Sequence, residues 1–265
     1  MKKYLVIGNP IEHSLSPLLH NFWIRKNNIN AIYEKKKINE IEIKDLIIEL
    51  KNEKIHGINV TLPFKKSVIP FLDKLSVEAD MSQSVNTIYK ENEKIIGHNT
   101  DIAGFELGLR HIKYDIKGKK VLILGAGGVV SSIILALKKM DVGKIILSNR
   151  TLRKAEELKF FFPYLEIVEW GKIPEFQMII NATSIGLEEK DEIKLDYKNL
   201  GSEKLFYDII YNPKQTNFLK KAKTFKNKTE NGKMMFIYQA HQAFTIWHKI
   251  MPIIDSETIK LLKND

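Results

Sequence analysis

Apolar and polar positions form two different patterns in the first hundred residues. Short runs rich in β-branched and aromatic residues predict buried strands at 4–8, 31–38 and 55–62. Between these runs, apolar positions recur every three or four residues and predict helices at 17–27, at 42–52 and from Phe64 onward. Strands that alternate with helices indicate a mostly parallel sheet that helices cover.

A hairpin and a second series of the same kind follow. Two apolar runs at 84–90 and 94–100 flank the turn "ENE" and predict the hairpin. From Lys119 onward, strands are expected within 119–128, 144–151, 176–186 and 203–213, and helices at 129–140 and 152–162. The last long stretch with helical spacing is 232–252. The pattern therefore predicts two successive sheets with a boundary near 101–118.

The composition limits the classes of site. The chain has 265 residues, 44% of them hydrophobic, which is enough for packed cores. The absence of cysteine excludes disulfides, cysteine nucleophiles and thiolate metal sites, and it fits a cytoplasmic protein. The histidines lack carboxylates at metal-ligand spacing, so no metal site is expected. The uncharged stretch 121–137 holds three glycines and two serines in 17 residues, too few to span a bilayer.

The formal net charge of +10 favours anionic partners. Lysines are scattered and interleaved with glutamates, as in 35–54, which is typical of solvated helix faces. A nucleic-acid interface would require a basic stripe with aromatic platforms or a known module, and the sequence has neither. We therefore expect a small anionic substrate and an anionic cofactor, and no nucleic-acid or membrane partner.

A glycine turn opens the second series. The residues "GAGG", Gly125 to Gly128, end a strand and begin a helix, which is the context in which such a turn binds phosphate. Backbone N–H groups at that helix N-terminus carry partial positive charge and can hold a pyrophosphate. We expect a dinucleotide here; a purely structural turn is the alternative.

The next strand ends in "SNRT", and this segment indicates which dinucleotide. An acidic residue near this point would bind the ribose of NAD, whereas a guanidinium accommodates the 2′-phosphate of NADP. Arg150, followed by Arg153 and Lys154, favours NADP. Ordinary surface cations are the alternative, but cations on the first turn of a helix oppose the helix dipole unless an anion is present.

Four polar segments stand where strands end or turns begin: "HSLSP", "NVTLPFK", "VNT" and "HNTD". Their hydroxyl and amide groups suit a polyol, and they supply Ser14, Ser16, Asn59, Thr61, Lys65, Asn86 and Asp101. Lys65 and Asp101 are candidates for a proton-transferring pair. Ser16 before Pro17 also fits the N-cap of the following helix, so capping and ligand binding both remain open for it.

The chain resembles the shikimate dehydrogenases, which reduce 3-dehydroshikimate to shikimate with NADPH. The resemblance runs from Gly8 to Trp247 through an ordered set of motifs: "GNPIEHSLSPLLHN", "GINVTLPFK", "VNT", "GHNTD", "GAGG", "NRT", "NATSIG", "DIIYNP" and "QAHQAF". It implies two open α/β domains with a cleft between them. The first, 1–101, would bind substrate, carry the catalytic residues and be closed by C-terminal helices in 233–265. The second, 102–232, would be a Rossmann-like NADP-binding domain.

The resemblance also implies residue roles. The catalytic pair would be Lys65 and Asp101. The substrate would be bound by Ser14 and Ser16 at its carboxylate, by Asn59, Thr61, Asn86, Asp101 and Gln239 at its hydroxyls, and by Tyr211 closing over the carboxylate end. The cofactor would be bound by Gly125, Ala126, Gly127, Gly128, Val129, Asn149, Arg150, Thr151, Lys154, Thr183, Ile209, Gly232 and Met235. The enzyme would act in the cytoplasm, on the route to chorismate and aromatic amino acids. It would be a monomer or a homodimer.

Two departures and two alternatives accompany this interpretation. "VVSS" follows the glycine turn where the family usually has alanine, and Lys154 stands where an arginine is common, so NADP preference over NAD is expected to be weaker. A quinate/shikimate dehydrogenase with relaxed substrate or NAD use is the first alternative. A non-catalytic protein that binds a metabolite or NADP is the second, but a sensor has no need of the pair formed by Lys65 and Asp101.

Overall fold

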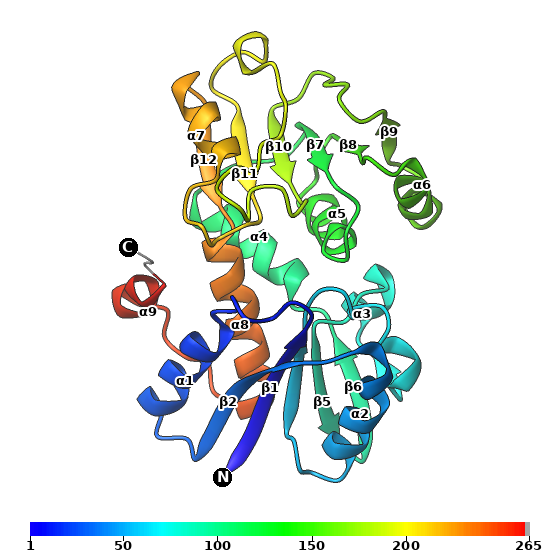
Figure 1. Ribbon diagram of the computed structural model, residues 1–265, viewed down its shortest axis with the longest axis vertical. Coiled ribbons are helices and arrows are strands. Elements are labelled where there is room, and N and C mark those ends of the chain that lie inside the picture. Colours follow the sequence, from blue (N-terminus) through cyan, green and yellow to red (C-terminus); the bar gives the residue numbers. More distant parts are fainter. Residues whose placement is uncertain (263–265) are drawn as a thin grey trace. The chain divides into compact units, whose positions relative to one another are not determined.

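The structure, a computed structural model, describes residues 1–262. The described chain forms two compact units, each with one six-stranded sheet (Figure 1). The first unit contains Met1–Phe105 and the described residues from Ile237 onward, and the second contains Glu106–Phe236. The last three residues of the predicted range 233–265 lie outside the described residues. The prediction of an α/β fold is confirmed.

The first sheet has the strand order β2-β1-β3-β5-β6-β4. Its strands are β1 (Lys2–Gly8), β2 (Ala31–Lys37), β3 (Gly57–Val60), β4 (Lys74–Leu75), β5 (Thr87–Glu91) and β6 (Lys94–His98). The helices are α1 (Ser16–Lys26), α2 (Ile43–Lys51), α3 (Val77–Ser82) and α9 (Ser256–Leu261), with α4 (Asp101–His111) and α8 (Lys233–His248) containing the two unit boundaries. β5 and β6 form the predicted antiparallel hairpin.

Successive residues of β1 pack on opposite faces of this sheet. Leu5 lies in a buried cluster with Leu46 of α2. Tyr4, on the other face, contacts Trp247 of α8 with 5.1 Å between ring centroids. Figure 1 accordingly shows α2 and α3 on one side of the sheet and α1 and α8 on the other. The unbroken apolar run of β1 therefore reflects burial on both faces.

Two local expectations are wrong. Ser16 is the first residue of α1 rather than its N-cap; Leu15 holds the cap position, and the Ser14 hydroxyl accepts a hydrogen bond from the Ser16 N–H at 3.3 Å. The helix expected from Phe64 is a series of turns over 62–68, followed by a 3₁₀ turn at Ile69–Phe71. Pro70 lacks the backbone donor that a continuing helix needs, so no α-helix forms there.

The second sheet is parallel throughout, in the order β12-β11-β10-β7-β8-β9. The strands are β7 (Lys120–Leu124), β8 (Lys144–Ser148), β9 (Glu166–Val168), β10 (Met178–Asn181), β11 (Leu205–Asp208) and β12 (Lys228–Asn231). The helices are α5 (Val130–Lys139), α6 (Leu152–Phe161) and α7 (Asn217–Thr224), and a 3₁₀ turn spans Tyr197–Asn199. Another 3₁₀ turn, Glu40–Glu42, precedes α2 in the first unit. The sequence pattern does not reveal the two edge strands, β9 and β12, because both are short and incompletely buried.

Candidate active site

The polar segments of the first unit meet at one edge of its sheet. β1 and β3 run parallel, and β5 runs antiparallel to both β3 and β6. The carboxyl ends of β1, β3 and β6 therefore lie beside the amino end of β5. The four motifs follow or precede the strands at this edge, which explains how positions far apart in sequence come together.

Lys65 and Asp101 form the ion pair that the sequence predicts. The Lys65 Nζ lies 2.5 Å from an Asp101 carboxylate oxygen, and the two side chains are only 13% and 8% exposed. Asp101 is the first residue of α4, where the partial positive charge of the helix N-terminus favours a carboxylate. The Lys65 carbonyl accepts a hydrogen bond from the Val85 N–H at 2.8 Å, which fixes the lysine backbone beside β5. The pair is thus positioned from two separate elements.

Asn86 organises the amide and hydroxyl groups beside this pair. Its side-chain oxygen accepts from the Thr100 N–H at 2.8 Å, and its amide donates to the Thr100 hydroxyl at 2.9 Å. The same amide lies 3.5 Å from the side-chain oxygen of Gln239 on α8. The structure therefore brings Gln239 to the motifs of the first hundred residues.

Asn59 is buried and its hydrogen-bonding groups are engaged within the protein. Its oxygen accepts from the Tyr33 hydroxyl at 2.7 Å, and its amide donates to the Asn86 carbonyl and to the Thr87 hydroxyl, both at 3.0 Å. These bonds saturate the amide hydrogens of Asn59. Its clearest contribution is therefore to fix the backbone of Asn86, rather than to contact a ligand hydroxyl.

Ser14, Ser16 and Thr61 complete this edge. The Ser16 hydroxyl makes no hydrogen bond to any described residue, although the side chain is buried. Thr61 packs so closely on Gly8 that a Cβ at Gly8 would lie 2.5 Å from the Thr61 methyl carbon. The glycine at the end of β1 thus lets the loop with the two serines approach the end of β3.

The glycine turn of the second unit has the geometry of a phosphate cradle. Gly125 has φ of 109°, and a Cβ there would lie 2.8 Å from the Ala182 carbonyl oxygen. At Gly127, by contrast, a Cβ would meet no described residue within 4 Å other than its chain neighbours, so the turn is open on that side. Helix α5 follows Val129 without a side-chain cap, which leaves backbone donors for an anion. Ala126 and Gly128 lie in the same turn.

Arg150 and Lys154 are exposed cations close to the end of β8. Neither makes an ion pair within residues 1–262, whereas Arg153 pairs with Glu157 at 3.1 Å. The Asn149 amide donates to the Thr151 carbonyl at 2.8 Å and shapes the turn that carries Arg150. Two unpaired cations at this turn suit a ligand phosphate.

Asn181 and Asp208, the last residues of β10 and β11, anchor the loops that follow them. The Asn181 oxygen accepts from the Thr183 hydroxyl at 2.7 Å and the Thr183 N–H at 3.0 Å. Its amide donates to an Asp208 oxygen at 3.1 Å. Asp208 also accepts from the Ile210 N–H at 3.0 Å and the Thr216 hydroxyl at 2.6 Å. Burial raises the pKa of Asp208 to about 6, although these three donors oppose the rise.

The remaining predicted cofactor positions are Ile209, Gly232 and Met235. A Cβ at Gly232 would lie 2.0 Å from the Ile209 carbonyl oxygen, so only glycine fits there without movement of the backbone. Met235 is buried in α8, and Tyr211 stacks on Phe236 with 4.3 Å between ring centroids. Tyr211 belongs to the second unit, so its expected closure over the substrate stays a prediction.

Several residues that hold the site together are not among the residues predicted from the sequence. They are Tyr33, Thr87 and Thr100 in the first unit and Asn181, Asp208 and Thr216 in the second. A signal was present for Asn181 and Asp208, because each is a polar residue that ends a buried strand within a quoted motif. Tyr33 gives no such signal, since its partner Asn59 is 26 residues away.

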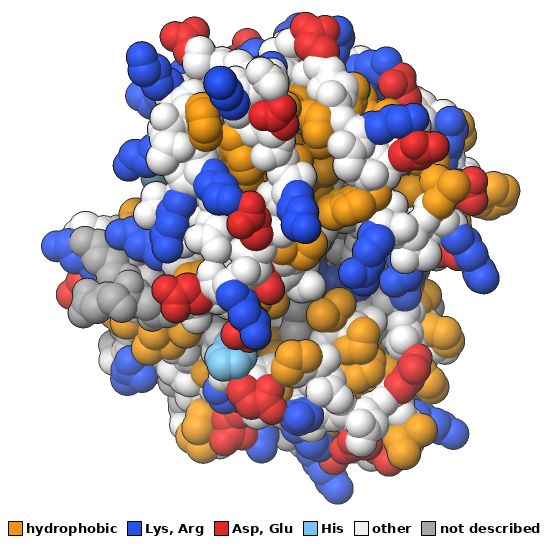
Figure 2. Space-filling view, turned by 45° about the horizontal axis from the view of Figure 1, so that its top comes forward, with side chains coloured by type: hydrophobic (Ala, Val, Ile, Leu, Met, Phe, Trp, Pro, Cys, Tyr) orange, Lys and Arg blue, Asp and Glu red, His pale blue; other side chains and the backbone are white. Residues whose placement is uncertain are grey.

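Other classes of site receive no support from the described residues. Within 1–262, no three His, Asp or Glu side chains are grouped so that they could hold a metal ion. No helix in that part of the chain has the length and apolar character needed to cross a membrane. Lys and Arg side chains are interspersed with Asp, Glu and apolar side chains on the face shown in Figure 2.

Comparison with known proteins gives a consistent family. The shikimate dehydrogenase substrate binding domain matches residues 6–88, and the shikimate / quinate 5-dehydrogenase family matches 106–214. A protein of Pelagibacter ubique named shikimate dehydrogenase (NADP(+)) is 64% identical over 98% of both chains. One from Aquifex aeolicus is 42% identical over 92% of this chain and 90% of its own.

Solved structures agree. The crystal structure of shikimate dehydrogenase from Aquifex aeolicus has a TM-score of 0.90 at 38% identity, covering 100% of this chain and 98% of its own. That of the Thermus thermophilus enzyme, in complex with NADP(H) and shikimate, has a TM-score of 0.90 at 30% identity, covering 99% and 98%. A 5-ketofructose reductase of Gluconobacter also matches, with a TM-score of 0.88 at 28% identity, covering 98% and 97%. Enzymes that act on different substrates thus share this fold, so the fold does not identify the family by itself. The sequence identity to shikimate dehydrogenases and the shared motifs do, and the chain belongs to the family of NADP-dependent shikimate dehydrogenases.

Proposed function

We propose that this enzyme catalyses the reversible reduction of 3-dehydroshikimate to shikimate with NADPH, on the route to chorismate and the aromatic amino acids. The observation that carries the proposal is the buried ion pair of Lys65 and Asp101, at 2.5 Å, beside a set of amides and hydroxyls. A proton donor among such groups suits reduction of a ketone on a hydroxylated ring.

The first unit supplies the substrate-binding groups in this proposal. Ser14 and Ser16 bind the carboxylate, and the unengaged hydroxyl of Ser16 supports that role. Thr61, Asn86 and Gln239 bind the ring hydroxyls. Asn59 acts through Asn86, because its own amide hydrogens are already engaged.

Lys65 delivers the proton to the carbonyl oxygen. As hydride adds to the carbonyl carbon, negative charge develops on that oxygen, and an ammonium group in a shielded site stabilises it strongly. The carboxylate of Asp101 orients the ammonium and can accept a hydrogen bond from the neighbouring ring hydroxyl. The low exposure of both side chains keeps water from screening the interaction.

The second unit fits NADP. The open side of Gly127 and the uncapped start of α5 suit a pyrophosphate, and the two unpaired cations Arg150 and Lys154 suit an adenosine phosphate. Thr183, Ile209, Gly232 and Met235 would lie toward the nicotinamide, and the Asn181 and Asp208 network fixes the loops that carry the first two. NADPH, when bound, supplies the hydride.

The substitution Arg150→Asp tests the phosphate contact. We expect the KM for NADPH to rise about 10- to 100-fold, because a charge-assisted bond is lost and a like charge replaces it. The KM for NADH should change little. Arg153→Asp is the matched control, since Arg153 already pairs with Glu157. Unchanged NADPH affinity in Arg150→Asp would show that the phosphate binds elsewhere.

The proposed reaction is tested by NADPH oxidation with 3-dehydroshikimate, run beside 3-dehydroquinate and with NADH in parallel. Turnover with 3-dehydroshikimate and NADPH, and weak turnover otherwise, is the expected result. Equal use of 3-dehydroquinate or NADH would favour a quinate/shikimate dehydrogenase. Binding without turnover in every combination would contradict an enzymatic role. The proposal extends to a cytoplasmic enzyme that is a monomer or homodimer, which size-exclusion chromatography with light scattering would test.

A further inference from the structure

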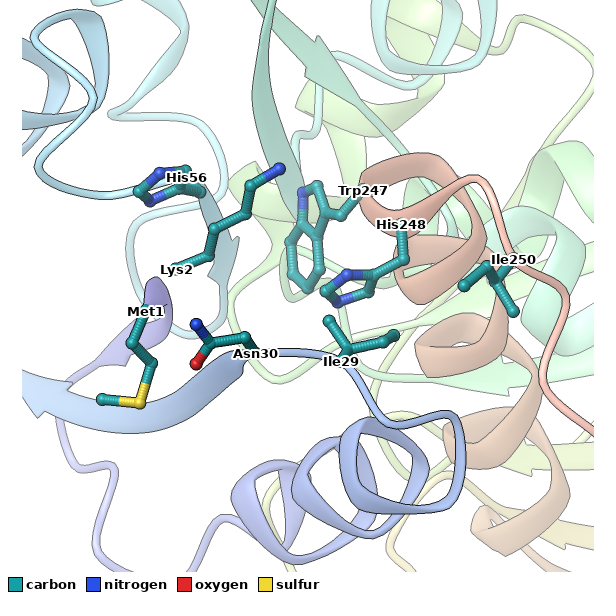
Figure 3. Close-up of a pocket in the computed structure, with 8 residues that line it drawn as sticks. All are labelled: Met1, Lys2, Ile29, Asn30, His56, Trp247, His248 and Ile250. Carbon is teal, nitrogen blue, oxygen red and sulfur yellow. The ribbon is translucent and has the colours of Figure 1, made fainter.

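A cavity of about 420 Å³ opens in the first unit (Figure 3). Its lining residues are Met1, Lys2, Ile29, Asn30, His56, Trp247, His248 and Ile250. Lys2 begins β1, and His56 directly precedes β3. The active-site motifs follow the carboxyl ends of the same two strands. The cavity therefore lies at the opposite edge of the sheet, and we name it the amino-edge cavity.

Basic groups gather in the lining of the amino-edge cavity. Lys2, His56 and His248 line it, and no Asp or Glu does. Lys2 makes no ion pair within the described part of the chain, whereas its neighbour Lys3 pairs with Glu34 at 2.7 Å. Glu53 is close enough to act electrostatically on Lys2 and His56, but its ion pair is with Lys90, at 2.9 Å. Lys2 therefore has no direct carboxylate partner in the described part of the chain, and a bound anion can take that place.

Two side chains of the cavity, one imidazole and one amide, can donate hydrogen bonds. The Nδ1 of His56 accepts from the Lys3 N–H at 3.3 Å, so the proton of the neutral ring lies on Nε2. The carbonyl of Asn30 accepts from the Lys2 N–H at 3.0 Å, and its side chain makes no hydrogen bond within residues 1–262. Figure 3 shows the Lys2 side chain extending between His56 and Trp247, so ammonium and imidazole approach the same space.

The opposite wall is apolar and held in place. The Trp247 indole donates to the Ile88 carbonyl at 3.2 Å and packs on the Tyr4 ring, while His248 packs between Tyr4 and Phe244. Ile29 and Ile250 complete this wall. A fixed apolar surface beside cationic donors is the usual make-up of a small-molecule site.

We propose that the amino-edge cavity binds a small organic carboxylate. Its carboxylate meets Lys2 and His56, and its apolar body lies against Trp247 and Ile29. The apolar wall favours this ligand over inorganic phosphate, which is charged but has no apolar group to bury against Trp247 and Ile29. The proposal does not depend on the function assigned to the Lys65 site, because its residues and its readout are separate.

Charge within the cavity sets the expected pH dependence. Burial first, then the charge of Lys2 and that of the amino group of Met1, lower the pKa of His56. The charge of Glu53 and the hydrogen bond from the Lys3 N–H oppose this shift. Burial and Lys2 also lower the pKa of His248 to about 4, and His248 in turn faces the buried His20. A bound carboxylate should raise the pKa of His56, so binding should tighten as the pH falls through the range in which His56 gains its proton.

The test is a titration of the full-length protein with benzoate, followed by the NMR signals of the histidine side chains. Benzoate should shift the His56 signal with a Kd of about millimolar, as expected for a ligand of so few atoms. Benzyl alcohol, which has the same body without charge, and inorganic phosphate should shift it less. Lys2→Gln should weaken benzoate binding about tenfold, or about 1.4 kcal/mol, whereas Lys94→Gln, an exposed lysine at another position, should not.

Each other outcome overturns the proposal. If benzoate does not shift the His56 signal, the cavity does not bind it. If Lys2→Gln binds benzoate as tightly as the unchanged protein, Lys2 does not pair with the carboxylate. If phosphate binds as tightly as benzoate, the apolar part of the ligand does not contribute to binding. If benzyl alcohol binds as tightly, the negative charge does not contribute. Turnover of Lys2→Gln without benzoate should match that of the unchanged protein, which confirms that the variant folds.

Discussion

Lys65→Ala is expected to lower kcat for 3-dehydroshikimate reduction by about 10²- to 10⁴-fold, the range that a positioned proton donor contributes. The KM for the substrate should change less, because the serine, threonine and amide groups that bind it remain. Steady-state kinetics with both substrates varied separates the two effects. The large effect follows from the 2.5 Å contact with Asp101 in a site where neither side chain is more than 13% exposed.

Lys66→Ala is the matched control, because Lys66 is adjacent and exposed and makes no ion pair within residues 1–262. It should retain the turnover of the unchanged enzyme. Thermal unfolding of both variants shows whether each is folded, since Lys65→Ala leaves Asp101 buried without its partner. Turnover that survives Lys65→Ala would remove Lys65 from the mechanism.

Asp208→Ala is expected to destabilise the protein by about 3 kcal/mol or more, because it leaves three buried donors without an acceptor. These donors are the Ile210 N–H, the Asn181 amide and the Thr216 hydroxyl. The midpoint of thermal unfolding should fall by about 6–12 °C. The KM for NADPH should rise as well, since the loops that begin after Asn181 and Asp208 lose their shared anchor.

Asp208→Asn separates the charge from the hydrogen bonds, because asparagine can keep most of them. The folded-state pKa of about 6 lies above the ordinary 3.8, so the folded chain prefers the protonated carboxyl. The contribution of this group to stability is present below about pH 4 and is lost as the pH rises through about 6. The unfolding free energy of Asp208→Asn should therefore rise relative to the unchanged protein across this window, by about 3 kcal/mol.

Urea unfolding of both proteins at several pH values measures this difference directly. Glu156→Gln, an exposed carboxylate of the same unit, should show no comparable change. A constant difference between Asp208→Asn and the unchanged protein from pH 4 to pH 7 would contradict the assignment of Asp208 as the buried group that titrates.

Local pattern was sufficient for much of this fold and insufficient for its polar contacts. The strand of Lys120–Leu124 and the glycine turn after it were predictable, since a buried apolar run followed by glycines has few structural solutions. The series of turns after Thr61 was not, because Pro70 outweighs the helical spacing of the apolar residues around it. The shared edge of the motifs followed once the hairpin was recognised.

The candidate residues illustrate the same limit. Lys65 and Asp101 were recognisable from motifs, and the structure places them in contact, while their role in proton transfer stays a prediction. The amide of Asn59 donates to Asn86 and Thr87, which are 27 and 28 residues away in the sequence. A local sequence pattern cannot predict contacts between residues so far apart. Ser16 was ambiguous because an N-cap and a ligand contact require the same hydroxyl, and only the backbone position distinguishes them.

The part of α8 from Ile237 onward belongs to the first unit, and this constrains the order in which the chain can fold during synthesis. The indole of Trp247 occupies the space over Gly57, where a Cβ would lie 2.5 Å away, and Phe244 packs on Trp23. A ribosome releases these two residues only after the whole second unit, which is continuous in sequence from Glu106 to Phe236. The second unit can therefore complete its core first. Until α8 is synthesised, one apolar face of the amino-terminal sheet stays without the residues of α8 that cover it.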